Sequence, residues 1–387
     1  MSVTTNVALN TSSIEKINNP IHQATGLPNR TYTCGEFFTF ERERLFSEQW
    51  TGLTQACVIP NPGDIWPINW MGIPLVIVRT QNNQVKVFHN VCSHRGNKLV
   101  WNTCNRQKTM TCPYHAWSYS LTGDLIGTPH IGGHGTHQVD NFDRSKHSLR
   151  EVRSYIWMDI VFINLAENQP DFREYISNLE QRFHTLSTPN QYTSLKPAGD
   201  NGVLNLEFNA NWKLVVENNL ESYHLPWVHP SLNAMNRLED HYHFYGGDLF
   251  AGQGTTAYVP DRGNLPQFPR FEPWNQQYAE YPTLFPNVLL GVQSDHFWSI
   301  VIQPEKPGRT KERLQIYYLN DGATSDEHAP TRQWQLQSWT KIFKEDVSVV
   351  EGMQEGRFSP AFCGGVFSQK MDAPTHHFAK WAANRLG

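Results

Sequence analysis

The sequence has few cysteines and no long apolar segment, and each absence excludes a class of protein. Six cysteines in 387 residues are too few for a scaffold held by disulfides, so metal or redox chemistry better explains Cys92, Cys104 and Cys112, which lie near one another. The longest apolar stretches, 74–78 and 156–165, are too short or too interrupted to cross a bilayer. We expect no membrane association. Because the first residues lack a basic-then-apolar signal pattern, we also expect a cytoplasmic protein.

Charge of one sign is not concentrated anywhere in the chain. Its 32 lysines and arginines against 36 aspartates and glutamates give a net charge of −4, without a run of five or six like charges. We therefore expect neither nucleic-acid nor anionic-membrane binding, since both need clustered basic residues. No GxGxxG motif follows a predicted strand, so any nicotinamide cofactor should be bound by another protein. The expected partners are small molecules and proteins.

Three parts of the chain differ in composition and periodicity. Residues 1–36 are polar and rich in turn formers, which is typical of an arm or short helix that packs on a larger domain. Residues 37–150 carry hairpin patterns and are expected to form a small β domain. Residues 151–387 mix strands with helices and form a second domain, so the predicted fold class is α+β. The predicted elements are hairpins that pair 75–79 with 85–91, 116–121 with the strand from residue 125, and 297–302 with 312–319, strands 160–165 and 203–208, and helices 36–48, 171–186 and 330–356.

Cysteine and histidine occur as two closely spaced pairs at the ends of predicted strands. Cys92 and His94 form the first pair, and Cys112 and His115 follow after seventeen residues. Thiolate and imidazole suit both zinc and iron–sulfur clusters. Zinc motifs usually pair Cys with Cys or His with His within one loop, whereas each loop here offers one of each. The mixture favours a two-iron, two-sulfur cluster with both cysteines on one iron and both histidines on the other. A structural zinc is the alternative.

A second group of candidate ligands comprises Glu221, His224 and His229. Glu221 and His224 are three residues apart and would share one face of a helix. His229 lies five residues further on, about 140° around an ideal helix, so it joins that face only if the helix stops. Pro226 is expected to stop the helix, because it removes an N–H and disfavours α conformation at the preceding residue. The two imidazoles would then converge.

Two neutral imidazoles and one carboxylate make the facial triad of non-haem Fe(II) oxygenases, which leaves sites open for dioxygen. Asp346 is the first candidate, because it falls on the apolar face of the predicted helix 330–356, where an unpaired carboxylate would be costly to bury. Glu345, Glu351 and Asp295 are alternative ligands. Two histidines at this spacing also occur commonly at surfaces and in cores without a metal.

Together the two groups resemble those of the α (oxygenase) subunits of Rieske non-haem iron oxygenases, the ring-hydroxylating class, over nearly the whole chain. The resemblance implies an antiparallel β Rieske domain followed by a helix-grip (Bet v1/START-like) catalytic domain with a long antiparallel sheet. It implies one Rieske two-iron two-sulfur cluster and one mononuclear Fe(II) per subunit. The motifs that carry it are CSHRG (92–96), CPYHAW (112–117), NWK (211–213), ENNLESYHLPWVH (217–229) and EDVSVVEGMQEG (345–356).

The resemblance also implies the reaction and the partners. Dioxygen and electrons from NADH or NADPH, delivered by a separate flavin or iron–sulfur reductase directly or through a ferredoxin, would hydroxylate a small organic substrate. A homotrimer is implied, in which Glu221 bridges the cluster histidine of one subunit and the iron histidine of the next. Asn218, Asn211 and Tyr223 would support the ligands. The family usually has Asp where Glu221 stands, and Glu resembles the branch that acts on carnitine, glycine betaine, choline and proline betaine.

The substrate is less well defined by the residues. An aromatic cage would bind a trimethylammonium ion, and residues 284–298 resemble the pocket-side sheet of betaine and choline oxygenases, so we expect oxidation of an N-methyl or quaternary amine. An aromatic acid would instead need a basic side chain, for which Arg237, Arg262 and Arg270 are candidates. The alternatives are an aromatic ring-hydroxylating (di)oxygenase, a Rieske electron carrier without oxygenase activity, and a zinc-stapled binding module. The cage candidates are Tyr242, Phe244, Tyr245, Phe250, Tyr258, Trp274, Tyr278, Phe285, Phe297 and Trp298.

Overall fold

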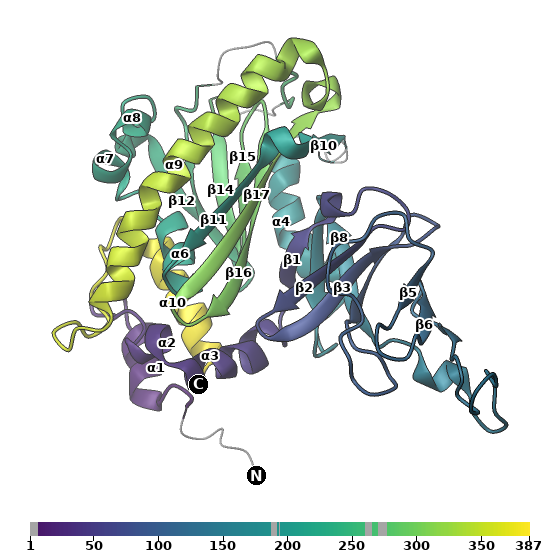
Figure 1. Cartoon of the computed structure of the whole chain (residues 1–387). Helices are drawn as coiled ribbons and strands as arrows, with labels where there is room; N and C mark the ends of the chain where they lie inside the picture. The colour runs from purple at the N-terminus through teal and green to yellow at the C-terminus, as the bar shows by residue number, and fades with distance from the viewer. Residues whose placement is uncertain (1–6, 187–191, 193, 260–264, 270–276) are drawn as a thin grey trace. The chain divides into compact units, whose positions relative to one another are not determined.

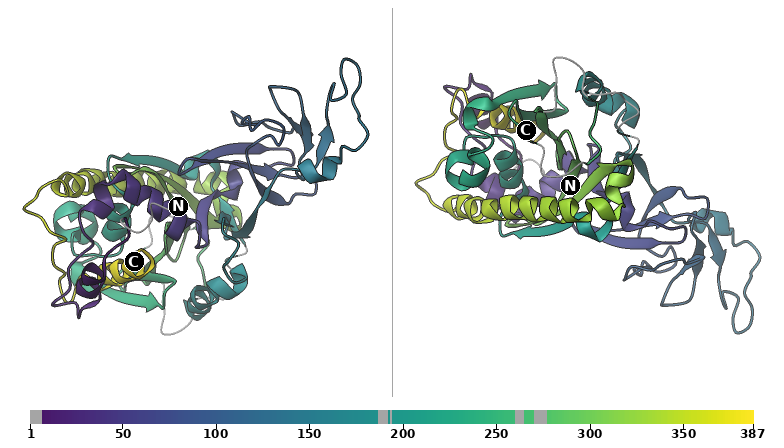
Figure 2. Two further views of the ribbon diagram at one scale, coloured as in Figure 1. Left: turned by 90° about the horizontal axis from the view of Figure 1, so that it is seen from below. Right: turned by 90° about the horizontal axis from the view of Figure 1, so that it is seen from above.

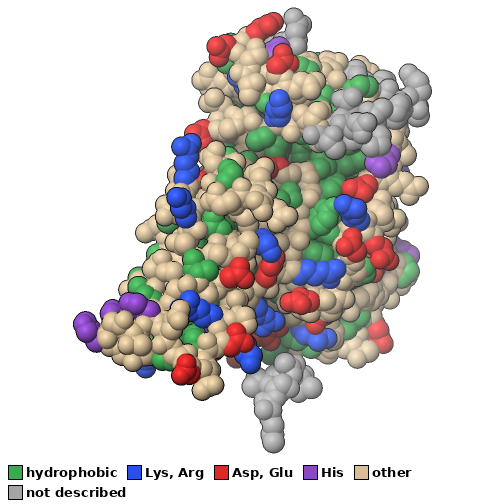
Figure 3. Space-filling model, turned by 90° about the vertical axis from the view of Figure 1, so that its right-hand side faces the viewer, with side chains coloured by type: hydrophobic (Ala, Val, Ile, Leu, Met, Phe, Trp, Pro, Cys, Tyr) green, Lys and Arg blue, Asp and Glu red, His purple; other side chains and the backbone are tan. Residues whose placement is uncertain are grey.

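Two compact units make up the chain in a computed structural model. One unit joins residues 1–52 to 168–387, and the other holds residues 53–167. No helix among the described residues has both the length and the apolar character needed to span a bilayer. On the face shown in Figure 3, the described acidic and basic side chains are interspersed rather than gathered by sign. The structure describes residues 7–186, 192, 194–259, 265–269 and 277–387.

The smaller unit consists of a six-stranded sheet, in the order β1-β9-β8-β4-β3-β2, and a three-stranded sheet, in the order β5-β6-β7 (Figure 1). Val76 and Phe88 of the larger sheet and Tyr119 of the smaller sheet belong to one buried core, which also contains Cys92 and Cys112. The two cysteines are therefore held by the hydrophobic core. The strands are β1 (Thr51–Gln55), β2 (Ile65–Trp70), β3 (Ile73–Arg79), β4 (Val85–His89), β5 (Thr109–Thr111), β6 (Ser118–Ser120), β7 (Leu125–Gly127), β8 (Glu151–Trp157) and β9 (Ile160–Asn164).

This unit starts and ends later than the predicted domain 37–150. Strand β8 pairs with β4 through Val87 and Val152, and β9 pairs with β8, so both strands belong to the sheet of this unit. Periodicity placed a strand at 160–165 correctly but could not show which sheet it joins. The two predicted hairpins, β3–β4 and β6–β7, are confirmed, and Gly123 supplies a positive φ of 92° in the second turn.

The larger unit is built on an eight-stranded antiparallel sheet in the order β10-β17-β16-β15-β14-β13-β12, with β11 also paired to β17. The predicted hairpin at 297–319 forms its longest strands, β16 and β17. An α+β fold with a long antiparallel sheet is thus confirmed. The strands are β10 (Leu195–Pro197), β11 (Val203–Phe208), β12 (His241–Gly246), β13 (Phe250–Thr255), β14 (Ala279–Leu284), β15 (Val288–Val292), β16 (Phe297–Lys306) and β17 (Arg309–Leu319).

Helices pack around this sheet. The long helix α9 runs along one face of the sheet, where it contacts β11 and α6, and α10 packs on β12, β13 and α1 (Figures 1 and 2). The helices are α1 (Thr11–Asn18), α2 (Arg30–Thr33), α3 (Gly35–Glu41), which continues as a π-helical turn η2 (Arg42–Phe46), α4 (Phe172–Leu186), α6 (Trp212–Asn219), α7 (Leu225–Val228), α8 (Pro230–Asn233), α9 (Ala329–Gly356) and α10 (Ala373–Arg385). Short 3-10 turns are η3 (Ala56–Val58), η4 (Arg144–His147), η5 (Gly199–Gly202), η6 (Leu238–Asp240), η7 (Asn320–Ala323) and η8 (Asp326–His328).

Helix α9 begins and ends close to the predicted positions Pro330 and Gly356. Its predicted apolar face is only partly buried: Val350 is fully buried, whereas Trp339 and Phe343 are half-buried because they line a cavity. The sequence pattern therefore identified the correct face of α9. The pattern did not show that part of this face lines a cavity while the rest packs in the core.

A buried ion pair joins the N-terminal segment to α6. The Nζ atom of Lys213 lies 2.5 Å from Oε1 of Glu41 and donates to the carbonyl of Thr31 at 2.7 Å, and both charged side chains are fully buried. Trp212 Nε1 donates to the other oxygen of Glu41 at 3.3 Å. Burial raises the pKa of Glu41 and lowers that of Lys213, so each charge depends on its partner.

We expect Lys213→Met to destabilise the protein by about 3–5 kcal/mol, because it leaves Glu41 buried without its cation. The matched control is Lys86→Met, since the Lys86–Glu151 pair has side chains that are 25% and 48% exposed and should contribute at most about 1 kcal/mol. Thermal unfolding curves of the two variants measure the difference. Equal shifts in Tm for both variants would contradict the account.

Candidate metal centres

Two loops of the smaller unit have the same backbone geometry. In the first, Cys92 N–H donates to the carbonyl of Asn97 and Gly96 N–H donates to the carbonyl of Cys92. In the second, Cys112 N–H donates to the carbonyl of Trp117 and Ala116 N–H donates to the carbonyl of Cys112. Gly96 and Ala116 both have positive φ, 70° and 55°. A non-glycine residue rarely adopts this conformation, so the surrounding structure must impose it at Ala116.

The four predicted cluster ligands divide by burial. Cys92 and Cys112 are buried, whereas His94 and His115 are exposed with ring centroids 4.6 Å apart. Burial, together with the neighbouring Cys112, raises the pKa of Cys92, so a bound cation is needed to favour its thiolate. A pair of buried thiols beside a pair of exposed imidazoles fits a binuclear cluster with one iron inside and one at the surface.

Tyr119 lies against the cysteine side of this arrangement. Its hydroxyl is 3.3 Å from Sγ of Cys92 and accepts a hydrogen bond from Ser93 N–H at 3.0 Å. Burial raises the pKa of Tyr119 to about 12, so the hydroxyl keeps its proton and can donate it to the sulfur. On the histidine side, His94 stacks on Trp117 with centroids 4.6 Å apart.

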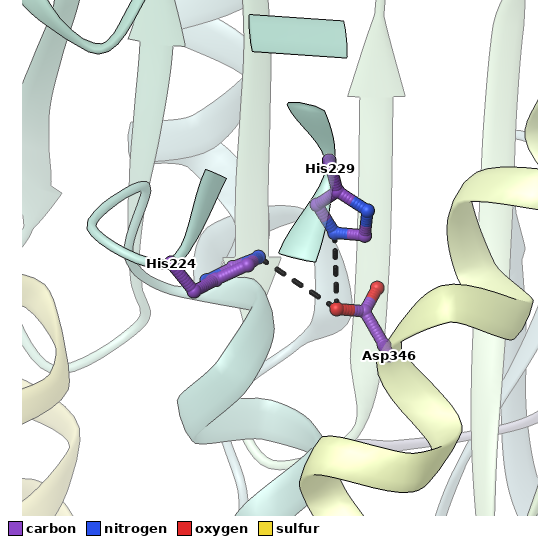
Figure 4. A group of neighbouring side chains, drawn as sticks. All are labelled: His224, His229 and Asp346. Carbon is purple, nitrogen blue, oxygen red and sulfur yellow. Dashed lines mark hydrogen bonds and ion pairs between the residues drawn. The ribbon is translucent and has the colours of Figure 1, made fainter. Parts of the chain in front are cut away.

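In the larger unit, His224, His229 and Asp346 point their ligand atoms at one another (Figure 4). Oδ1 of Asp346 is 3.0 Å from Nε2 of His229 and 3.7 Å from Nε2 of His224. Metal–ligand bonds of about 2.1 Å at 90–120° would place the ligand atoms about 3.0–3.6 Å apart. The donor set fits a mononuclear metal. It is the one group of three such atoms within 4.8 Å among the described residues.

The two histidines converge in a way that differs from the prediction. Helix α6 ends at Asn219, before Glu221, so Glu221 and His224 do not share a helix. Pro226 does not stop a helix either: it lies in the first turn of α7, where a missing N–H costs nothing. His229 lies between α7 and α8 with φ −120° and ψ 59°, and this non-helical residue provides the turn.

Each of the two imidazoles has a carboxylate at its other nitrogen. Nδ1 of His224 is 2.6 Å from Oε1 of Glu221, and Nδ1 of His229 is 2.8 Å from Oε2 of Glu345. A carboxylate accepts, so the Nδ1 atoms carry the protons and the Nε2 lone pairs are free to bind a metal. Burial alone would lower the pKa of His229, but Asp346 and Glu345 raise it above its usual value. This is the electrostatic environment in which a cation at Nε2 is stabilised.

Two family models match the chain. The Rieske [2Fe-2S] domain matches residues 49–143, and the ring hydroxylating alpha subunit (catalytic domain) matches residues 196–387. The matched segments contain both candidate metal centres. The chain belongs to the Rieske non-haem iron oxygenases. It is an oxygenase subunit of this class, and the expected cofactors, a Rieske two-iron two-sulfur cluster and a mononuclear non-haem iron, are confirmed.

Curated relatives of this Rieske oxygenase are similar over most of its length. The carnitine monooxygenase oxygenase subunit of Escherichia coli K12 is 27% identical over 357 residues, which are 88% of this chain and 87% of the relative. The chloroplastic choline monooxygenase of Arabidopsis thaliana is 25% identical over 366 residues, or 93% and 82% of the two chains. The glycine betaine monooxygenase oxygenase subunit of Chromohalobacter salexigens is 29% identical over 215 residues, or 55% and 45%.

Solved structures share the fold of this oxygenase. The quaternary ammonium Rieske monooxygenase CntA, in complex with L-carnitine, matches with a TM-score of 0.78 at 23% identity over 97% of this chain and 99% of that chain. Naphthalene 1,2-dioxygenase from Rhodococcus sp. matches with a TM-score of 0.74 at 18% identity over 97% and 98%. The predicted architecture, a Rieske domain followed by a catalytic domain, is thereby confirmed.

Of the supporting residues predicted for this oxygenase, Asn218 alone contacts a candidate ligand with its side chain. Its Nδ2 atom donates to Oδ1 of Asp346 at 3.2 Å. The Asn211 side chain instead caps α6 by accepting from Lys213 N–H, so it has a structural part in α6. The Tyr223 side chain is exposed beside Trp227, and it is the backbone N–H of Tyr223 that donates to Glu221. A supporting role for the Tyr223 side chain stays a prediction.

The alternative carboxylates lie elsewhere or act differently. Glu351 accepts from Asn209, and Asp295 belongs to a buried network with Tyr258 and His296. Glu345 does reach the site, but at Nδ1 of His229 and not at the metal position. The position of Glu345 directly before Asp346 was the sequence signal that it could contact His229.

A cavity opens at the three ligands. Four of its aromatic side chains, Tyr281, Trp298, Trp339 and Phe343, pack on one another with ring centroids 5.4–6.5 Å apart. A second cavity shares Tyr281 and Trp339 with the first, so the two adjoin. Trp298 was a predicted cage residue, whereas the other three were not.

Most other predicted cage residues do not line the inner cavity. Tyr258 lines only the adjoining cavity, and Trp274 lies outside the described residues. Tyr242 of β12 instead donates to Glu280 of β14, which also binds Arg182 of α4. Tyr242 therefore has a structural contact between the sheet and α4.

For the Rieske centre, we expect Tyr119→Phe to lower the reduction potential of the cluster by about 20–60 mV. A hydrogen bond to the sulfur stabilises the reduced, more negative state, and its loss removes about 0.5–1.5 kcal/mol. Redox titration of the visible spectrum measures the shift. Tyr114→Phe is the control, because it keeps the ring contact with His115 and should leave the potential unchanged.

For the mononuclear centre, we expect Glu345→Gln to weaken iron binding by about 10–100-fold, because a neutral amide accepts from Nδ1 of His229 more weakly than a carboxylate does. Iron retention during dialysis against graded chelator measures the affinity. Glu351→Gln, on the same helix but bonded to Asn209, is the control. Equal iron retention in both variants would show that the Nδ1 contact has no effect on the metal.

Proposed function

We propose that the chain is the oxygenase component of a monooxygenase that oxidises a quaternary ammonium or N-methyl compound. The observation that carries the proposal is the three-ligand group opening into a cavity walled by Tyr281, Trp298, Trp339 and Phe343. The faces of Trp and Tyr attract a trimethylammonium ion. The substrates named for the relatives, carnitine, choline and glycine betaine, all carry this group and support the proposal.

We assign the iron to His224, His229 and Asp346. When bound there, the metal supplies the redox chemistry that activates dioxygen. The residues around it prepare the site: Glu221 and Glu345 hold the protons on Nδ1 of the two imidazoles, which directs both Nε2 atoms inward.

Further residues position the third iron ligand, Asp346, and a separate set would hold the Rieske cluster. Asn218 holds Oδ1 of Asp346 at the side of the cavity. The aromatic wall excludes water from most of the cavity and orients the N-methyl end of the substrate. We assign the Rieske cluster to Cys92, Cys112, His94 and His115.

Glu221 is also proposed to connect His224 with a cluster histidine of a neighbouring subunit in a homotrimer. Its carboxylate accepts from His224 Nδ1 and from two backbone N–H groups, yet its side chain is 16% exposed. Each carboxylate oxygen has two lone pairs, so capacity remains for a further donor. A chain of hydrogen bonds from imidazole to carboxylate to imidazole would serve electron transfer between subunits.

The oxygenase subunit works with a reductase, and the finer description of that partner is part of the proposal. We expect a separate NAD(P)H-dependent flavin or iron–sulfur reductase, acting directly or through a ferredoxin. The cytoplasmic location stays a prediction.

Ring hydroxylation is the second candidate, favoured by the likeness in fold to naphthalene 1,2-dioxygenase and by the apolar wall of the cavity. An aromatic acid fits less well, because the described residues that line the inner cavity include no Arg or Lys. Arg237 pairs with Glu239 and is exposed, and Arg262 and Arg270 lie outside the described residues. The interpretations as an electron carrier or a zinc module are wrong, since the chain belongs to an oxygenase family.

We expect the iron-loaded protein, with a surrogate reductase and NADH, to consume dioxygen and release an aldehyde with carnitine, glycine betaine, choline or proline betaine. Hydroxylation of a carbon next to nitrogen gives a product that breaks down to an aldehyde. His224→Ala should keep the visible spectrum of the cluster and lose turnover. An oxygen electrode combined with aldehyde detection makes both measurements. Uptake with aromatic compounds only, without aldehyde, would instead identify a ring hydroxylase.

A further inference from the structure

The inner cavity contains a carboxyl group that is not among the metal ligands. Glu312, on β17, is 5% exposed and lines the cavity together with Phe208 and Trp298. Among the described residues no hydrogen bond or ion pair to its side chain is formed. A buried carboxylate without a partner is costly and therefore calls for a specific explanation.

The strand register explains why Glu312 faces the cavity. Side chains alternate along a strand, and Glu312 pairs with Leu206 of β11, two residues from Phe208. Trp298 pairs with Ile316, four residues from Glu312, so all three cavity residues lie on the same face of the sheet. Their neighbours Lys311 and Arg313 lie on the opposite face.

The electrostatics of the cavity favour a positive ligand. Burial, followed by the charge of Asp346, raises the pKa of Glu312 to about 8, so a positive group beside it is needed to favour the charged carboxylate at neutral pH. His241 donates through Nδ1 to Gln253 at 2.8 Å, which leaves its buried Nε2 as a second acceptor without a partner. The described lining thus offers aromatic faces and acceptors, and it includes no Arg or Lys.

We propose that Glu312 is the counter-charge for the cationic nitrogen of the substrate and that it sets the preference for a quaternary ammonium group over a neutral group of the same shape. This inference rests on the proposed function and deepens it. The aromatic wall binds a trimethylammonium and a tert-butyl group through similar contacts, whereas a carboxylate distinguishes them by charge. Glu312 is therefore a residue that determines specificity by touching the substrate.

The test compares two ligand pairs in which carbon replaces nitrogen: choline with 3,3-dimethylbutan-1-ol, and glycine betaine with 3,3-dimethylbutanoate. Binding to the iron-loaded protein is measured by titration calorimetry. We expect the wild type to bind at least one of the two quaternary ammonium compounds more tightly than its carbon isostere. Glu312→Gln should weaken binding of that compound by about 10–100-fold and leave binding of the uncharged 3,3-dimethylbutan-1-ol unchanged. Glu312→Asp, which keeps the charge, should restore most of the preference.

Iron content and the cluster spectrum establish that each variant is folded and loaded, and Glu305→Gln, at an exposed position on β16, is the matched control. An unchanged ratio of cation to isostere in Glu312→Gln would overturn the inference and leave the proposed function intact. Loss of iron from Glu312→Gln would also overturn it, because the residue would then act on the metal. A wild type that binds none of these cations, yet turns over an aromatic compound, would overturn both proposals.

Discussion

The hydrogen bonds from the two Nδ1 atoms to Glu221 and Glu345 are the constraint on which the catalytic site depends. They fix the tautomer and the direction of both imidazoles, so that the two Nε2 atoms face Asp346. Glu345 and Asp346 are adjacent on α9, so the position of this helix on the sheet places one ligand and orients another at once. The packing of α9 thereby determines the geometry of the candidate metal site, and the same helix contributes Trp339 and Phe343 to the cavity wall.

In the smaller unit, backbone loops and the hydrophobic core position the candidate ligands of the Rieske cluster. Two loops of the same backbone geometry present one buried cysteine and one exposed histidine each, and the cysteines belong to the hydrophobic core between the two sheets. Burial makes an unbound thiolate unfavourable, and the hydroxyl of Tyr119 offsets part of that cost at Cys92. A rigid core around the sulfur side and exposure on the imidazole side suit a centre that exchanges single electrons at its surface.

Local spacing in the sequence was enough to suggest both candidate metal centres, because the cysteine–histidine pairs and the two histidines His224 and His229 each lie a few positions apart. The errors arose where backbone conformation decides. The chain turns at His229, for which the following Pro230 was the available signal, while Pro226 lies in the first turn of a helix that it was expected to stop. The roles of Glu345 and Glu312 could not be predicted from local spacing. Both residues lie more than sixty positions after the two histidines in the sequence and reach the site only through the fold. The one sequence signal for Glu312 was its position in β17: it is a glutamate on the same buried face as Thr310, Leu314 and Ile316.

The ratio of iron to labile sulfide in the purified protein tests the central claim of two separate metal centres most directly. A Rieske cluster plus one mononuclear iron predicts about three irons for two sulfides in the wild type. His229→Ala and Asp346→Ala should lower the ratio to about one, with the visible spectrum of the cluster unchanged. A wild-type ratio of one after iron loading, or variants that keep the wild-type ratio, would contradict the assignment of the second iron to His224, His229 and Asp346.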